Sequence, residues 1–460
     1  MYGLEIRKTK ALGDIMKKGI SFKKLEKYEK NFDSNVANKI AMNAVTNNGI
    51  NNAALNRDVY NNNQNAFSIE VKAGDVCNQK QSGRCWMFAA LNTFRLQVMD
   101  KLNLDNMELS QNYPLFYDKL EKSNLFLENM IETIDMPVTS REVAFLLTAP
   151  LGDGGQWDMF RSLVSKYGVV PKDVMPETEV SSMTREMDKY LTTKLREFAC
   201  EFRKMKAQGK SVDDLRKAKD EMLDTIYRML CICLGKPPVK FTWETKDKDG
   251  KFVKVKDITP QDFYKEYVGM PLDDLVTVIN APTGDKPYYE TYTVKYLGSV
   301  ADGDYPVKYL NLPIEELKKI AIKELKDGNV IWFGSDVGQF SERKKGFLTM
   351  DALCVEELFS TKFDMTKEER LDFGESLMTH AMVITGVDLD EKGKPIKWKV
   401  ENSWGKDVGF DGYYVMDDEW FSEYVYQILL DKKYLNKKQA EAFKKDPIVL
   451  EPWDPMGSLA

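Results

Sequence analysis

Residues 78–86 read NQKQSGRCW and place a cysteine, Cys85, where a loop of small residues leads into a helix. After Cys85 the apolar residues recur at helical spacing, which predicts an amphipathic helix with Cys85 in its first turn. The N–H groups of a first turn have no partner within the helix and carry the positive end of its dipole, so they lower a thiol pKa. Gln79 supplies a side-chain amide that can donate to a developing oxyanion. The stretch therefore predicts a thiolate nucleophile with an oxyanion donor.

A free cysteine at the start of a helix is more often a small buried apolar residue than a nucleophile. The neighbours of Cys85 favour the nucleophile. Ser82 and Gly83 allow close approach of a backbone, while Arg84 and Trp86 are unusual beside a purely structural cysteine. The stretch resembles the segment around the nucleophile of papain-type cysteine peptidases, and its form SGRCW resembles the bleomycin hydrolase and aminopeptidase C family. We therefore treat Cys85 as the candidate catalytic residue.

A thiol hydrolase needs a base, and the chain contains one histidine, His380. A lone histidine on an apolar strand is more often simply packed. Residues 380–386 predict a strand, 390–394 a turn, and the alternating residues 396–400 a returning strand. Folding this hairpin at its turn brings His380 to within about two residues of Asn402. An amide there can orient one ring nitrogen and leave the other for the thiol, so we predict His380 as the base and Asn402 as its orienting residue.

The segment NSWG, residues 402–405, resembles the papain-type segment that holds the catalytic asparagine. The resemblance implies that Trp404 shields the hydrogen bond between His380 and Asn402 from water. The alternative is an ordinary buried tryptophan. Because the motifs follow the order Gln and Cys, then His, then Asn, we expect a papain-like catalytic set.

Two segments are candidates for binding the substrate. GDGGQW, residues 152–157, is by itself typical of a turn, but it resembles the glycine pair that lines the cleft in the family. The resemblance implies that Gly154 and Gly155 hold the residue before the scissile bond. The ending EPWDPMGSLA, residues 451–460, resembles the family's terminal arm, which implies that Ala460 offers its carboxylate to the amine of a substrate. A frayed polar tail is the alternative.

The resemblance implies an α+β, papain-like fold of two lobes with the cleft between them. Papain-type enzymes carry the histidine ~130 to 150 residues after the cysteine, and here the separation is about twice that. A charged region with helical spacing accounts for the difference, as additions do in the family. The predicted organisation is an N-terminal arm (1–65), a helical lobe with the Cys85 helix (66–170), a helical insertion (171–306), a β-rich, barrel-like lobe with His380 and Asn402 (307–445) and a C-terminal arm in the cleft (446–460).

Local signals give two further expectations outside the catalytic motifs. The Asn-rich stretch 46–65 is typical of loop and turn. Pro313 is expected to start a helix that ends before Gly328, and residues 330–333 are expected to form a buried strand after it.

Composition limits the function. The chain has 460 residues, 43% of them hydrophobic, and a net charge of −6, which is typical of a soluble globular protein too long for one core. No apolar stretch approaches ~18 residues and no signal pattern opens the chain, so we expect a cytoplasmic protein without a membrane partner. Six irregularly spaced cysteines predict reduced thiols. With one histidine and no CxxC motif, we expect no metal site. The sequence contains no phosphate-binding or dinucleotide-binding motif, so we expect no cofactor. The N-terminal residues do not interleave aromatic and basic side chains, so we expect no nucleic-acid partner.

The motifs and the resemblance together predict a cysteine aminopeptidase that hydrolyses N-terminal residues from peptides through a thiolate acyl-enzyme. The C-terminal arm is expected to restrict the cleft to free amino ends. Three alternatives stay open: an amidase of the bleomycin hydrolase type acting on non-peptide amides, an acyltransferase that uses the same residues, and a non-catalytic scaffold. The resemblance also implies a homohexamer, which composition does not show.

Overall fold

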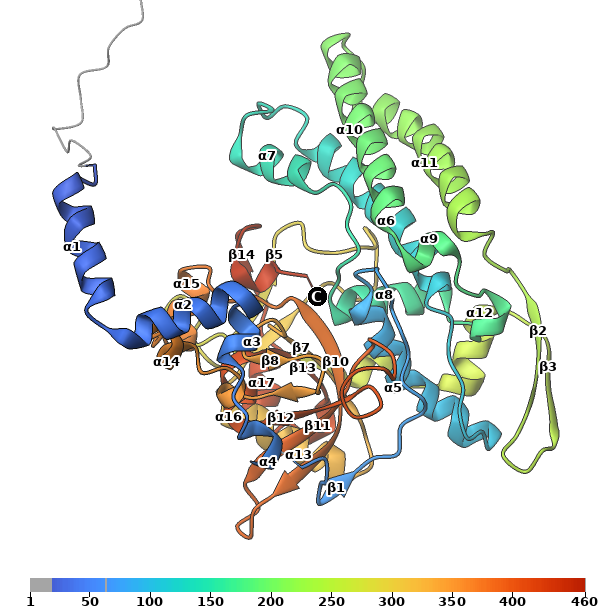
Figure 1. Ribbon diagram of the computed structural model, residues 1–460. Helices are drawn as coiled ribbons and strands as arrows, with labels where there is room; N and C mark the ends of the chain where they lie inside the picture. Colours follow the sequence, from blue (N-terminus) through green and yellow to red (C-terminus); the bar gives the residue numbers. More distant parts are fainter. Residues whose placement is uncertain (1–18, 63, 460) are drawn as a thin grey trace, which may run out of the picture. The chain divides into compact units, whose positions relative to one another are not determined.

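The structure is a computed structural model that describes residues 19–62 and 64–459 (Figure 1). Its contacts divide the described chain into two compact units, one formed by 19–56 with 353–363 and the other by the remaining residues. Neither α1 nor α2 of the smaller unit buries a side chain. The helices of this unit are α1 (Phe22–Asp33), α2 (Val36–Asn48), α3 (Ile50–Ala54) and α14 (Val355–Phe359).

The Asn-rich stretch 46–65 is mostly helical, so its prediction as loop and turn is wrong. It contains the end of α2, the whole of α3, and α4 (Val59–Asn62). The side-chain amides of Asn47, Asn48 and Asn52 each donate to the backbone carbonyl four residues earlier, at 2.7 to 2.9 Å. These amides therefore bond within the helix and do not capture the backbone in a turn.

The larger unit is built on a mixed sheet with 12 strands among the described residues. The middle of this sheet, from β4 through β13, β7, β10 and β11 to β12, is antiparallel. In spatial order the strands are β14 (Ile448–Leu450), β5 (Thr291–Val294), β6 (Tyr309–Asn311), β4 (Leu275–Ile279), β13 (Val425–Asp431), β7 (Ile331–Ser335), β10 (His380–Leu389), β11 (Pro395–Glu401), β12 (Tyr413–Asp417), β9 (Phe347–Leu348) and β8 (Ser341–Glu342), with β1 (Ile69–Glu70) paired to β10.

Helix α13 (Ile314–Lys326) begins directly after Pro313 and buries Leu317, Ile320 and Leu325 in the apolar cluster that it shares with the central strands. The buried strand β7 follows it, so the expected helix and strand are confirmed. Three short helices complete this part of the chain: α15 (Lys367–Asp372), α16 (Asp418–Tyr424) and α17 (Lys437–Phe443).

The remaining helices form the other lobe of the larger unit. Helices α10 and α11 lie side by side as a long pair and both pack on α6 (Figure 1). The range predicted as a helical insertion, 171–306, contains this pair and a β-hairpin, and it also contributes β4 and β5 to the large sheet. Its boundaries stay a prediction. The elements are α5 (Cys85–Leu102), α6 (Asn112–Glu132), α7 (Arg141–Thr148), α8 (Trp157–Tyr167), α9 (Glu179–Ser182), α10 (Arg185–Ala207), α11 (Val212–Leu234), α12 (Pro260–Phe263), β2 (Phe241–Lys246) and β3 (Phe252–Ile258).

Helix α5, which begins at Cys85, is buried on every face from Cys85 to Arg95. The expected amphipathic pattern is therefore wrong for its first three turns. The reason is its position, because α5 packs on β7 and β10 of the sheet, on α8 and on the helical turn Tyr264–Val268. The indole Nε1 of Trp332 on β7 donates to the carbonyl of Trp86 at 3.1 Å and ties the first turn to the sheet.

A buried ion pair joins α5 to the end of β11. Arg95 Nη2 lies 2.7 Å from Glu401 Oε1, and these side chains are 0% and 1% exposed. The same carboxylate oxygen accepts from Asn92 Nδ2 at 2.8 Å, and Arg95 Nη1 donates to the carbonyl of Asp75 at 2.6 Å. A charge at such depth is stable only with its partners in place. The pair therefore fixes the register between the Cys85 helix and the strand that leads to Asn402.

Replacing Arg95 by methionine should leave Glu401 buried without its countercharge. We expect Arg95→Met to lower the free energy of unfolding in urea by about 3 to 5 kcal/mol. Lys444→Met, which breaks the exposed pair with Glu441, is the matched control and should change nothing measurable. Equal stability of the Arg95→Met and Lys444→Met proteins would contradict a structural role for the buried pair.

Candidate active site

The structure brings Cys85, His380 and Asn402 together. His380 is the first residue of β10 and Asn402 follows β11 directly, and the two strands pair as the predicted hairpin with Val383 opposite Glu401. His380 Nε2 lies 2.9 Å from Asn402 Oδ1. The sulfur of Cys85 accepts from the N–H of the residue after His380, at 3.5 Å. Because Nε2 is bound to the amide, Nδ1 is the ring nitrogen left to take the proton of a thiol.

The indole of Trp404 lies over the His380 ring, with ring centroids 4.9 Å apart and an angle of 32° between the planes. The ring of Tyr414 meets the same indole edge-on, with ring centroids 5.9 Å apart. The N–H of Ser403 donates to Asn402 Oδ1 at 2.7 Å and holds the amide in place. The arrangement keeps the imidazole and amide buried, at 4% and 1% exposure.

Gln79 is held against the segment that follows Asn402. Its backbone N–H donates to the carbonyl of Ser403 at 2.8 Å, and its side-chain oxygen accepts from the Ser403 hydroxyl. Its amide nitrogen donates to the carbonyl of Ser82 at 2.7 Å. Because an amide nitrogen carries two hydrogens, one is left for an oxyanion. Sequence reasoning missed Ser403, although it lies inside the NSWG motif.

The glycine segment lies against the residue beside Cys85. A Cβ on Gly155 would approach the indole of Trp86 to 2.5 Å, so a glycine is required there by packing. Trp86 Nε1 donates to the carbonyl of Asp153 at 2.8 Å, and the carbonyl of Gly154 accepts from Lys122 Nζ at 2.7 Å. These contacts fix the segment next to the nucleophile and leave its substrate role a prediction.

Asp153 is a second residue that sequence reasoning missed. Its Oδ2 accepts from the N–H of Gly83 at 2.7 Å, and its Oδ1 pairs with the buried Lys119 at 2.7 Å. The carboxylate therefore ties the loop before Cys85 to the glycine segment. The signal was present in the sequence, because Asp153 stands within the GDGG stretch.

Ser458 of the C-terminal arm bonds both to the residue after the glycine segment and to the segment before the histidine strand. The hydroxyl of Ser458 donates to the carbonyl of Met378 at 2.7 Å, and the carbonyl of Ser458 accepts from Gln156 Nε2. Met378 lies two residues before His380, and Gln156 directly follows Gly155. Ala460, the predicted partner of the substrate amine, lies outside the described residues.

A family model described as the Peptidase C1-like family matches residues 19–457. The chain belongs to this family. Aminopeptidase C from Lactobacillus delbrueckii subsp. lactis is 48% identical over 448 residues, which cover 97% of this chain and 99% of that protein. Bleomycin hydrolase from Rattus norvegicus is 42% identical over 430 residues, which cover 92% of this chain and 94% of that protein.

A solved structure shares the fold. The crystal structure of PepW from Lactobacillus rhamnosis HN001 superposes with a TM-score of 0.94 at 51% identity, and the match covers 96% of this chain and 99% of that one. The predicted papain-like α+β fold and the predicted family are confirmed. In the described part of this Peptidase C1-like chain, no cluster of three or more His, Cys, Asp or Glu could hold a metal ion. Among the same residues, no helix combines the length and apolar character needed to cross a membrane.

Burial controls the electrostatics of the catalytic pair. It raises the pKa of the Cys85 thiol to about 11, against the opposing effect of the N–H groups of Ala381, Trp86 and Cys85. It lowers the pKa of His380 to about 4, although the bond to Asn402 acts in the other direction. The N–H groups at the helix start lower the thiol pKa as expected, but desolvation outweighs them, so the net pKa of the Cys85 thiol is raised. Burial disfavours the charge of each group taken alone, and moving the proton from thiol to imidazole creates two opposite charges side by side.

The loss of activity at acid pH tests these pKa shifts. If Cys85 and His380 are the catalytic pair, their active form carries one proton in total, and we expect activity to be lost when a second proton binds as the pH falls. Because burial lowers the pKa of His380 to about 4, the acid limb of kcat/KM should lie well below the ordinary imidazole value of 6.5. Asn402→Ala should move the limb lower still, because the bond to Asn402 raises the pKa of His380. An acid limb at or above 6.5 in the unaltered enzyme would contradict this account.

Proposed function

We propose that this protein is a cysteine aminopeptidase that removes residues from the amino ends of peptides. The observation that carries the proposal is the position of the C-terminal arm, whose Ser458 bonds to Met378, two residues before His380, and to Gln156, directly after the glycine pair. The aminopeptidase C relatives favour peptide hydrolysis over action on non-peptide amides, acyl transfer or a non-catalytic scaffold.

The chemistry is acyl transfer through a thioester. Cys85 gives its proton to Nδ1 of His380, and the resulting thiolate attacks the carbonyl carbon of the first peptide bond. The amide of Gln79 and the backbone N–H of Cys85 donate to the oxyanion. His380 then protonates the leaving amine, the C–N bond breaks, and water activated by His380 hydrolyses the thioester. Asn402 keeps the imidazole oriented through these steps, and Trp404 excludes water from their hydrogen bond.

The direction of cleavage comes from the arm. Its bulk fills the sites upstream of the scissile bond, so a longer chain cannot extend there. The carboxylate of Ala460 pairs with the α-ammonium group of the substrate. Gly154 and Gly155 bind the backbone of the first residue.

A panel of free and amino-blocked peptides tests the direction of cleavage. The full chain should cleave substrates with a free amine and leave amino-blocked ones intact. A variant that lacks residues 456–460 should lose this preference and cleave blocked peptides internally, because the upstream sites are open. Unchanged preference in the shortened protein would refute the role of the arm.

We further propose a cytoplasmic homohexamer. Support for the cytoplasm comes from the six irregularly spaced cysteines, a usage typical of reduced proteins. Support for assembly comes from the family resemblance and from the smaller unit, where Phe22, Val36 and Ile40 of α1 and α2 are 85%, 73% and 65% exposed. Apolar side chains exposed in this number are typical of a surface that another chain covers.

Native mass spectrometry tests the assembly. The full chain should give six copies per particle, and Phe22→Asp with Ile40→Asp should shift the mass toward smaller species, because a charge is costly in an apolar interface. Lys23→Asp, next to Phe22 on α1, is the control for added negative charge. A monomeric full chain would contradict the proposal.

A further inference from the structure

The base of the C-terminal arm is held by helix α7 through one indole. The guanidinium carbon of Arg141 lies 3.5 Å from the centroid of the Trp453 ring. The ring of Phe145 meets the same indole at a centroid distance of 6.4 Å and an angle of 75°. Arg141 and Phe145 lie one turn apart on α7, so the helix presents a cation and a ring to Trp453 from one face.

The next residue of the arm, Asp454, forms a second anchor. Its Oδ2 lies 2.9 Å from Lys286 Nζ, and these side chains are 10% and 3% exposed. Its Oδ1 accepts from the N–H of Met456 at 2.8 Å and caps the short 3-10 turn at 455–457. One oxygen therefore shapes the arm while the other binds it to the body. Lys286 also pairs with Asp285 at 2.9 Å, so it stays partnered when the arm leaves.

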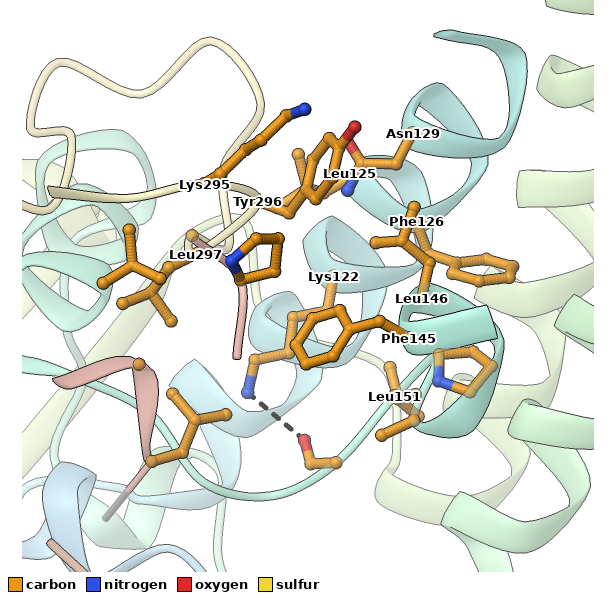
Figure 2. A pocket seen from close by; sticks show the side chains of 18 of the residues that line it. Lys122, Leu125, Phe126, Asn129, Phe145, Leu146, Leu151, Lys295, Tyr296 and Leu297 are labelled. Carbon is orange, nitrogen blue, oxygen red and sulfur yellow. Dashed lines mark hydrogen bonds between the residues drawn. The ribbon is translucent and has the colours of Figure 1, made fainter. Parts of the chain in front are cut away.

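One flank of the arm, on both sides of these anchors in the sequence, lines a pocket. A pocket of about 240 Å³ lies between α6, α7 and the segment after β5, and Pro452, Gly457 and Leu459 of the arm form part of its wall. Figure 2 shows the rings of Phe145 and Tyr296 on opposite walls of this pocket. Because the arm lines a pocket here, side chains do not enclose it on this flank. The arm is therefore held at its base by the two charged anchors and near its end by the hydrogen bonds of Ser458 with Met378 and Gln156.

We propose that Arg141 and Lys286 determine specificity for free amino ends by holding the arm in register. This inference rests on the proposed function. Asp454 lies six residues before the end of the chain. An arm fixed at its base as well as at Ser458 delivers its carboxylate to one place, whereas an arm held at Ser458 alone spreads it over a larger volume and lowers its effective concentration at the substrate amine. Both residues act through the arm and not on the reacting atoms.

The test compares kcat/KM for a free aminoacyl peptide with kcat/KM for the same peptide with a blocked amine. Asp454→Asn removes the charge that Lys286 binds and keeps a side chain able to cap the 3-10 turn. Arg141→Ala removes the cation over Trp453. Each should lower the ratio about tenfold, mainly by raising KM for the free peptide. Glu451→Gln, the same charge change at an exposed position of the arm, is the control and should leave the ratio unchanged.

The same substitutions in the protein that lacks residues 456–460 separate the arm from the body. There they should have no further effect on the ratio, because the segment they position is gone. An effect that persists, or an unchanged ratio in both full-length variants while the deletion lowers it, would overturn the inference and leave the proposed function standing. If the deletion itself leaves the ratio unchanged, the proposed role of the arm fails. Trp453→Ala removes the same contact between Arg141 and the indole by changing the arm. It replaces Arg141→Ala in the test if the Arg141→Ala protein does not fold.

Discussion

The ion pair between Arg95 and Glu401 is the constraint on which the site depends. Two opposite charges without solvent are stable only when the geometry and the additional hydrogen bonds are complete. Glu401 precedes Asn402, and Arg95 lies on the helix that begins with the nucleophile. Arg95 also binds the carbonyl of Asp75, four residues before Gln79. One buried pair thus keeps the predicted nucleophile, orienting amide and oxyanion donor in register, although Asn402 is far in sequence from the segment that holds Gln79 and Cys85.

The same burial gives the site its chemistry. It raises the pKa of the Cys85 thiol and lowers the pKa of the His380 imidazole, because each charge alone is poorly solvated there. A proton that passes between them produces a pair of opposite charges that stabilise each other. Hydrogen bonds to the oxyanion are also stronger where water is excluded. The indole of Trp404 covers the imidazole ring and is the predicted shield of its hydrogen bond to Asn402.

Much of the site could be predicted from the sequence because its signals are local. A single histidine and a hairpin with a clear turn were enough to place His380 beside Asn402. What the sequence could not predict depends on contacts between distant segments. The complete burial of α5 follows from its position between the sheet and α8, and the thiol pKa follows from that burial. Gly155 is required because the indole of Trp86 occupies the space of a side chain there. Trp453 packs against Arg141, which lies 312 residues earlier in the sequence. Neither contact has a local signature in the sequence.

The most direct measurement is to trap the acyl-enzyme. An aminoacyl substrate is mixed with the full chain, quenched in acid within the first turnovers, and the protein is examined by intact mass and peptide mapping. The account predicts one acyl group, on Cys85, and no adduct and no turnover in a Cys85→Ala protein that keeps the circular dichroism and melting temperature of the original. Turnover without an adduct on Cys85, or thiol-inhibitor-sensitive activity in the Cys85→Ala protein, would contradict it.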